Sequence, residues 1–302
     1  FAPAPRPSQV APMWQAPPSR ELHVTPGPAL PPVEIRVCSW NLHGKEISRG
    51  DDIGPWLVPS GCRADIYVIG AQELVELGAR SVVLSGAGDQ QKLAAFHARV
   101  SKALERTGDR FVKMCDFGMV GLALFVYVRE SLRQHCGELD CDRVKTGLDG
   151  MGGNKGAVCA RLRIGNFTVC FMNVHLASGQ EASEKRNENL YQVLADAFQG
   201  RSAHGSARPP KQIFKRRSIY RAADHDLTVI LGDFNSRLNV SKEEGWPRGT
   251  EKDWLPPDQI LLGMLPSMRG FEEGHIGFPP TYKYTPGTDE LNRSRCPAWC
   301  DR

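Results

Sequence analysis

The stretch LTVILGDFNSRL, Leu227 to Leu238, places a run of apolar residues directly before an Asp-Phe-Asn segment. The apolar run predicts a buried β-strand that ends near Gly232. Residues i and i+2 of an extended chain point to the same side, so Asp233 and Asn235 would face one pocket if the extended backbone continues. The alternative is an Asp-containing turn closed by its own side chain, which is the usual meaning of Gly-Asp after a strand. Other parts of the chain must decide between the two.

Further apolar segments have the length of strands, and two segments have the spacing of helices. The predicted strands cover residues 35–40, 66–73, 121–128, 156–164, 167–176 and 227–233. Apolar residues recur at three- and four-residue spacing over 90–108 and 183–199, which predicts amphipathic helices, and Ser183 is expected to cap the second. Sheets in the core with helices over their faces predict a layered α/β sandwich.

The bulk composition bounds the class of protein. With 302 residues, 41% of them hydrophobic, the chain is long enough to bury a large core. A net charge of +4 favours an anionic substrate or surface, but it is far from the signature of a dedicated nucleic-acid binder. The nine cysteines are scattered through apolar runs, which favours free thiols in a reducing compartment. No apolar run approaches the roughly 20 residues of a membrane span. We therefore expect a cytoplasmic protein that contacts membranes peripherally.

The chain divides into two regions of different composition. Residues 1–32 hold ten of the 22 prolines, which predicts a disordered tail or linker, with adaptor binding as the alternative to a plain spacer. The folded domain is expected to cover 33–302 and to be truncated at its C-terminal end, because Arg302 lies within a motif. Segment 201–224 carries seven Lys or Arg before its first acid. This segment is either a solvated loop or a contact with an anionic membrane surface.

Polar side chains follow five of the apolar or aromatic segments, at the point where each one ends. These residues are Asn41 and His43, Gln72 and Glu73, Asn173 and His175, Asp233 and Asn235, and Asp301. One such ending would be a turn, but five indicate a site. Carboxylates, carboxamides and imidazoles suit metal-assisted phosphoester hydrolysis.

The residue types suggest roles within such a site. Mg²⁺ takes oxygen ligands at few points and keeps several waters, so Glu73 with the support of an asparagine is a sufficient anchor. Asp233 is a candidate base for the attacking water, and Asn235 is a candidate to fix the position of that water. His175, with Asp301 as a candidate orienting partner, would stabilise charge on the phosphoryl oxygens.

A Gly-rich stretch adds a candidate phosphate contact. GMGGNKGAV, residues 150–158, predicts a turn whose Asn154 and Lys155 meet phosphate through amide and ammonium groups. The stretch lacks the order of residues of a P-loop. No Ser, Cys or His shows a flanking nucleophile motif, which favours direct attack by water over a covalent intermediate.

From about Val33 to Arg302 the chain resembles the inositol polyphosphate 5-phosphatase family, within the endonuclease/exonuclease/phosphatase superfamily. WNLHG resembles the family's first magnesium segment, and QELVEL resembles its glutamate segment. GGNKGAV, NVHLASG followed by EKRNENL, DHDLTVILGDFNSRL, FPPTYKY and RCPAWCDR appear in the family's order and spacing. The last three motifs in one chain are highly specific.

The resemblance implies a four-layered, deoxyribonuclease-I-like α/β sandwich with two central mixed β-sheets flanked by helices. It implies magnesium-dependent hydrolysis of the 5-phosphate from phosphoinositides or soluble inositol phosphates. In that family Asn41 and Glu73 would hold magnesium, and Asp233 would activate water. His175 and Asp301 would form a pair at the scissile phosphate, and Asn235 would orient the water.

The resemblance also implies contacts with the head group. Asn154 and Lys155 resemble the family's phosphate-contacting turn. Tyr282, Lys283 and Arg295 fall where the family contacts the neighbouring 4-phosphate, which favours phosphatidylinositol 4,5-bisphosphate. Lys and Arg are the usual partners of phosphate, so these cations are physically sensible there.

Departures from the family and other functions stay open at this point. The family continues past CDR to a histidine that binds the scissile phosphate, so the catalytic set of this chain is expected to be incomplete. A nuclease of the superfamily would share the strand-end residues but has no need for Tyr282 and Lys283. An inactive module that binds phosphoinositides is the third alternative. Trp40 and Trp299 are expected to pack in the core, and Phe117 with Met119 either packs there or faces lipid.

Overall fold

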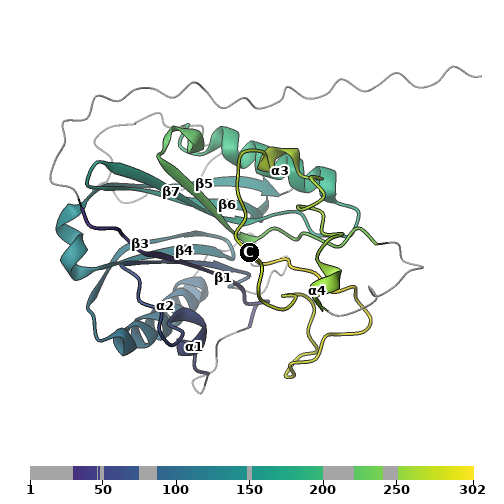
Figure 1. Cartoon of the computed structure of the whole chain (residues 1–302), viewed down its shortest axis with the longest axis horizontal. Helices are drawn as coiled ribbons and strands as arrows, with labels where there is room; N and C mark the ends of the chain where they lie inside the picture. Colours follow the sequence, from purple (N-terminus) through teal and green to yellow (C-terminus); the bar gives the residue numbers. More distant parts are fainter. Residues whose placement is uncertain are drawn as a thin grey trace, which may run out of the picture.

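Two four-stranded β-sheets lie at the centre of the structure, and helices cover their outer faces (Figure 1). The computed structural model describes residues 30–45, 47, 51–74, 87–147, 152–199, 221–240 and 251–302. The first sheet has the order β1 (Ile35–Asn41), β2 (Ile66–Gln72), β4 (Leu122–Arg129) and β3 (Phe111–Met119). The second has the order β5 (Cys136–Gly147), β6 (Gly152–Ile164), β7 (Phe167–His175) and β8 (Leu227–Asp233). Both sheets are mixed, because β1 pairs with β2 and β7 with β8 in parallel, whereas the other pairs are antiparallel.

Helices complete a sandwich of four layers, as the resemblance implies. Helices α1 (Gly54–Leu57) and α2 (Ala87–Leu104) cover the first sheet, and α3 (Ser183–Asp196) covers the second (Figure 1). The remaining short elements are α4 (Glu251–Trp254) and the 3₁₀ turns η1 (Glu105–Thr107), η2 (Glu130–His135), η4 (Ala222–Asp224) and η5 (Pro266–Met268). The fold class predicted from the sequence is confirmed.

Strand β2 illustrates how the sequence builds the core. All seven of its residues, IYVIGAQ, are buried. Ile66 and Val68 pack in the cluster between the two sheets, whereas Tyr67 and Ile69 pack in the cluster beneath α1 and α2. A strand covered on both faces has no solvent side, so its sequence is apolar throughout and does not alternate. Each fully buried apolar side chain contributes about 1.5–3 kcal/mol.

Two strands were absent from the sequence-based prediction. Strand β3 lies at the edge of its sheet and carries Lys113 and Asp116, and edge strand β5 carries several charged residues. Edge strands with exposed charges do not show the apolar run that marks a central strand. Phe117 and Met119 belong to β3 and not to a loop, and they are partly buried against the cluster between the sheets, which favours the packing alternative for them.

Two local predictions are also wrong. The Gly-rich segment is not a turn where it is described, because Gly152 begins the long strand β6. At Gly156 the backbone φ is +134° and an added Cβ would lie 1.9 Å from the carbonyl oxygen of Val144, so the glycine permits close strand pairing. Ser183 does not cap α3, since the N-cap is Ala182 and no side chain bonds there.

Other expectations concern the cysteines and the chain ends. All nine cysteines are free thiols, as predicted. Trp40 packs edge-on against Trp56, and Trp299 is buried, so both tryptophans are packing residues. Most of the Pro-rich region 1–32 and of the basic segment 201–224 lies outside the described residues. Among the described helices, none has the length and apolar character needed to cross a membrane.

Candidate active site

The four central residues of the site stand at the carboxyl ends of the two parallel strand pairs. Asn41 is the last residue of β1, and Glu73 directly follows β2. His175 and Asp233 are the last residues of β7 and β8, where they are paired in register. Strands β1 and β8 contact each other, so the two pairs meet at one edge of the sandwich. Parallel strands place their carboxyl ends on the same side, which explains why residues far apart in sequence converge here.

Asp233 is the most heavily contacted carboxylate of the site. Its Oδ1 accepts the backbone N–H of Asn235 at 2.7 Å. Its Oδ2 accepts Nδ2 of Asn41 at 2.9 Å and Nδ2 of Asn235 at 3.2 Å. Asn235 has a φ of +50°, so the extended backbone ends at Asp233 and a turn follows. Both interpretations of the opening stretch therefore hold in part, since the strand reaches Asp233 and its side chain also closes the turn.

Asn41 joins the two carboxylates across the sheets. Its Nδ2 also donates to Oε1 of Glu73 at 3.3 Å, while its Oδ1 accepts the backbone N–H of His43 at 2.9 Å. The His43 imidazole lies with Nδ1 3.4 Å from Oε2 of Glu73, and its side chain is 71% exposed. Asn41 and Glu73 thus meet as predicted, with the amide nitrogen of Asn41 facing the carboxylates.

His175 and Lys155 bring the imidazole and ammonium groups to the same carboxylates. Nε2 of His175 lies 3.3 Å from Oδ2 of Asp233 and 3.7 Å from Oε1 of Glu73. Nζ of Lys155, on β6, contacts the same Nε2. Glu73, His175 and Asp233 offer ligand atoms within 4.8 Å of one another.

The expected pair between His175 and Asp301 is not formed. Nδ1 of His175 and Oδ1 of Asp301 are both buried without a hydrogen-bond partner in the described part of the chain. Asp301 instead forms a backbone bridge with Asp233, and its N–H donates to Oγ1 of Thr281 at 3.0 Å. The carboxylates that face Nε2 of His175 are those of Asp233 and Glu73.

The residues expected to contact the head group lie on loops beside Asp301. Tyr282 pairs with Ala298 through backbone hydrogen bonds in both directions. The backbone N–H of Asn292 donates to the carbonyl of Lys283, and that of Arg295 donates to the carbonyl of Asn292. Lys283 and Arg295 therefore belong to one connected loop structure. Asn154 is half-buried on β6, next to Lys155 in the chain. Of these two residues, Lys155 is the one whose side chain contacts His175.

Arg237 is a residue that the sequence reasoning missed. Its Nη2 donates to Oδ1 of Asn235 at 2.9 Å, and its Nε donates to the carbonyl of Asn235 at 3.3 Å. Its guanidinium carbon lies 4.2 Å from the centre of the Tyr282 ring. The sequence does show a cation two residues after Asn235. It does not show the turn at Asn235, which directs the Arg237 side chain back toward the Asn235 carboxamide.

Burial and neighbouring charges shift the pKa values of three groups. Burial alone would raise the pKa of Asp233, but the contacts from His175, Lys155 and Asn41 hold it below its ordinary value. Burial lowers the pKa of Lys155, although Asp233 and Glu73 partly oppose this shift. Burial and the charge of Asp233 raise the pKa of the Asp301 carboxyl well above its ordinary value. The site therefore holds an ionised Asp233 next to a carboxyl that favours its neutral form.

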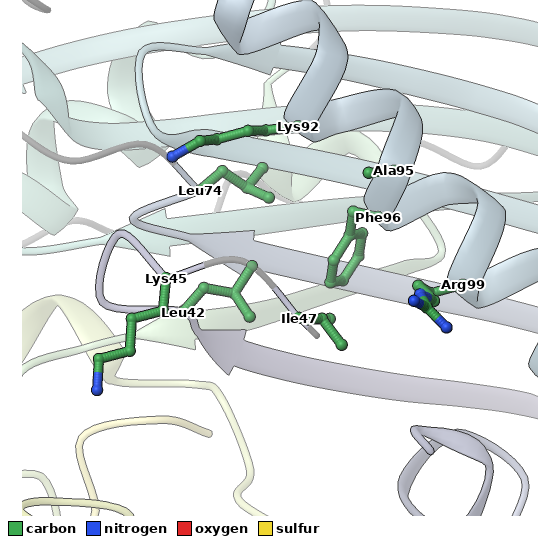
Figure 2. A pocket seen from close by; sticks show the side chains of 8 residues that line it. All are labelled: Leu42, Lys45, Ile47, Leu74, Lys92, Ala95, Phe96 and Arg99. Atoms are coloured by element: carbon green, nitrogen blue, oxygen red, sulfur yellow. The ribbon is translucent and has the colours of Figure 1, made fainter. Parts of the chain in front are cut away.

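A small pocket lies between α2 and the segments that follow β1 and β2 (Figure 2). It is lined by Leu42, Lys45, Ile47, Leu74, Lys92, Ala95, Phe96 and Arg99. Leu42 and Leu74 follow Asn41 and Glu73 in the chain, but none of the predicted site residues lines this pocket.

The arrangement at the strand ends fits a hard divalent cation. The carboxylates of Glu73 and Asp233 face one amide group, the Nδ2 of Asn41, which donates to both. Two carboxylates that converge in a buried site need positive charge between them. Carboxylate and amide oxygens are the ligands that Mg²⁺ and Ca²⁺ prefer, and a rotation of the Asn41 carboxamide would present its oxygen.

The two-sheet sandwich and its strand-end site define a member of the endonuclease/exonuclease/phosphatase superfamily. The chain belongs to the endonuclease/exonuclease/phosphatase family 2, whose model matches residues 38–302. The resemblance to inositol polyphosphate 5-phosphatases is likewise confirmed by the relatives described next.

The chain is similar in sequence to two curated relatives and in structure to one solved domain. The inositol-1,4,5-trisphosphate 5-phosphatase 1 of Schizosaccharomyces pombe is 33% identical over 89% of this chain and 24% of its own length. Human synaptojanin-1 is 31% identical over 90% of this chain and 18% of its own length. The chain thus spans about a quarter or less of these relatives. The crystal structure of the inositol polyphosphate 5-phosphatase domain of SPsynaptojanin, in complex with inositol (1,4)-bisphosphate and calcium ion, is 29% identical. It matches with a TM-score of 0.71 over 89% of this chain and 75% of that chain.

Proposed function

We propose that this chain hydrolyses the 5-phosphate of phosphatidylinositol 4,5-bisphosphate or of soluble inositol polyphosphates with the help of Mg²⁺. The observation that carries the proposal is the convergence of Asn41, Glu73, His175 and Asp233 at one edge of the sandwich. The S. pombe relative and the synaptojanin domain support the substrate class, since their names describe 5-phosphatases. The inositol (1,4)-bisphosphate bound to that domain carries no 5-phosphate, as expected of a product.

Glu73 and Asn41 would hold the ion. When bound, Mg²⁺ supplies positive charge that stabilises the phosphoryl oxygens and lowers the barrier to attack. The lowered pKa of Asp233 keeps its carboxylate ionised, so that it can accept the proton of the attacking water. The water oxygen bonds to phosphorus as the bond from phosphorus to the inositol oxygen breaks, and the inositol oxygen takes up a proton from solvent and leaves as a hydroxyl group. The ammonium of Lys155 and the imidazole of His175 lie beside Asp233 and would stabilise the charge that develops.

The preference for a neighbouring 4-phosphate rests on the cations of the C-terminal loops. The backbone of Asn292 forms hydrogen bonds with the backbones of both Lys283 and Arg295. Tyr282 pairs through its backbone with Ala298, three residues before Asp301. Two cations on one connected loop favour a second phosphate over a bare hydroxyl. Cytoplasmic location and peripheral contact with an anionic membrane surface are part of the same proposal, because such a lipid is presented at a membrane.

The test is release of inorganic phosphate from short-chain phosphatidylinositol 4,5-bisphosphate, with Mg²⁺ and with EDTA, by the 302-residue chain and by a longer chain that includes the further histidine expected from the family resemblance. We expect Mg²⁺-dependent release, no release from phosphatidylinositol 4-phosphate, and a loss of about 10³-fold or more in Asp233→Asn. Glu188→Gln, an exposed carboxylate on α3, is the matched control. Binding of the lipid without phosphate release, or cleavage of DNA instead, would replace this proposal with a binding module or a nuclease.

A further inference from the structure

Asn235 owes its orientation to an arginine that reaches no carboxylate of the site. The carboxamide of Asn235 has one acceptor and two donors, and the structure uses each of them. Oδ1 accepts from Nη2 of Arg237 at 2.9 Å, and Nδ2 donates to Oδ2 of Asp233 at 3.2 Å and to the carbonyl of Leu176 at 3.1 Å. A guanidinium group only donates, so Arg237 must face the oxygen of the carboxamide. The nitrogen is thereby directed to Asp233.

Arg237 is itself fixed on several sides. Its Nε donates to the carbonyl of Asn235 at 3.3 Å, and its backbone N–H donates to Oε1 of Gln259 at 3.3 Å. Its guanidinium lies over the ring of Tyr282, with the carbon 4.2 Å from the ring centre, and the residue is only 9% exposed. A planar guanidinium can stack on a ring and donate two hydrogen bonds at once, whereas the ammonium of lysine cannot.

We propose that Arg237 is a positioning residue that fixes the Asn235 carboxamide with its nitrogen toward Asp233, and that the ring of Tyr282 holds Arg237 in place. This inference rests on the proposed function for its catalytic consequence. Tyr282, which is expected to contact the 4-phosphate, is thereby connected through Arg237 to Asn235, whose Nδ2 donates to Asp233. Recognition of the head group and alignment of Asp233 would then depend on a common element.

The role predicts a characteristic effect on the rate constants. Arg237→Lys keeps the charge but loses the second hydrogen bond and the stacking, so we expect kcat to fall about 10- to 100-fold with KM changed by less than about 3-fold. Tyr282→Leu removes the stacking surface, and its effect on kcat should not add to that of Arg237→Lys. Arg143→Lys is the matched control, since Arg143 also lies near a ring, 5.8 Å from the centre of Phe117, and its guanidinium donates to the carbonyl of Gly118 and not to Asn235.

A second measurement does not depend on turnover. The side-chain NH₂ signals of Asn235, assigned by their loss in Asn235→Asp, should shift in the ¹⁵N–¹H spectrum of Arg237→Lys and remain unchanged in Arg143→Lys. If the unmodified chain releases no phosphate, the proposed function fails, and these signals alone decide the positioning role. Unchanged Asn235 signals in Arg237→Lys would overturn the inference, as would a change confined to KM in an active enzyme. A shifted signal together with a lowered kcat supports it.

Discussion

Gln72 and Asn173 form a direct hydrogen bond between the two sheets, with Nε2 of Gln72 2.5 Å from Oδ1 of Asn173. The amide nitrogen of Asn173 donates to the carbonyls of Ala71 and Ala123 on the opposite sheet. All of these groups are buried. Added Cβ atoms at Gly70 or Gly232 would lie 2.7 or 2.8 Å from Oδ1 of Asn173, so glycines make room for this bridge. The bridge fixes one sheet relative to the other directly behind the site.

The first prediction tests this bridge. Asn173→Leu removes the acceptor of the Gln72 amide and the donor to the carbonyls of Ala71 and Ala123, all of them buried, and each hydrogen bond lost at a buried group costs about 1–3 kcal/mol. We expect the free energy of unfolding in urea to fall by roughly 3 kcal/mol or more. Asn166→Ala, in the exposed turn between β6 and β7, should change it by less than about 0.5 kcal/mol. If the two variants had the same free energy of unfolding, the hydrogen bonds of Asn173 would not contribute to stability and the prediction would be wrong.

The second prediction concerns the metal. Glu73→Gln removes a charge from the ligand set but keeps the shape, so the Mg²⁺ concentration for half-maximal activity should rise about 10- to 100-fold. Titration of activity with Mg²⁺ measures this shift, and the Mg²⁺ concentration for half-maximal activity should be unchanged in Glu188→Gln. An unchanged Mg²⁺ dependence in Glu73→Gln would remove Glu73 from the ion site.

The third prediction concerns the glycine before Asp233. Gly232 has a φ of +129°, and an added Cβ would lie 2.1 Å from the carbonyl oxygen of Val174. Both the conformation and the contact with backbone penalise a side chain, so Gly232→Ala should lose about 3 kcal/mol or more of unfolding free energy. Gly274→Ala is the control, because nothing lies within 4 Å of its added Cβ. A stable, active Gly232→Ala protein would show that β7 and β8 can separate without cost.

The fourth prediction follows from the raised pKa of Asp301, which burial and the charge of Asp233 cause. A carboxyl with a raised pKa in the folded state stabilises fully below its unfolded pKa of about 3.9, and this stability is lost as pH rises toward the folded value. Asp301→Asn has no such proton to lose. In EDTA, its unfolding free energy relative to the parent chain should therefore increase as the pH rises above about 4, the unfolded pKa of the carboxyl. A difference that is constant with pH would place an ionised carboxylate at Asp301.

The sequence predicted which strand ends converge because their pattern is local. An apolar run followed by Asp233 or His175 marks both a buried strand and the position at which it stops. Strands β3 and β5 were not predicted, because an edge strand with charged residues lacks such an apolar run. The partner of His175 and the role of Arg237 depend on how the chain turns after Asp233, which spacing alone does not determine.

The site is assembled from both sheets, as a site between two subunits is assembled from two chains. Asn41 and Glu73 come from one half of the sandwich, His175 and Asp233 from the other, and neither half contains a working set. A substitution in the apolar layer between the two sheets is therefore expected to disturb the alignment of these four side chains while each sheet keeps its hydrogen bonds. Loss of activity with an intact fold should be read first as a loss of alignment.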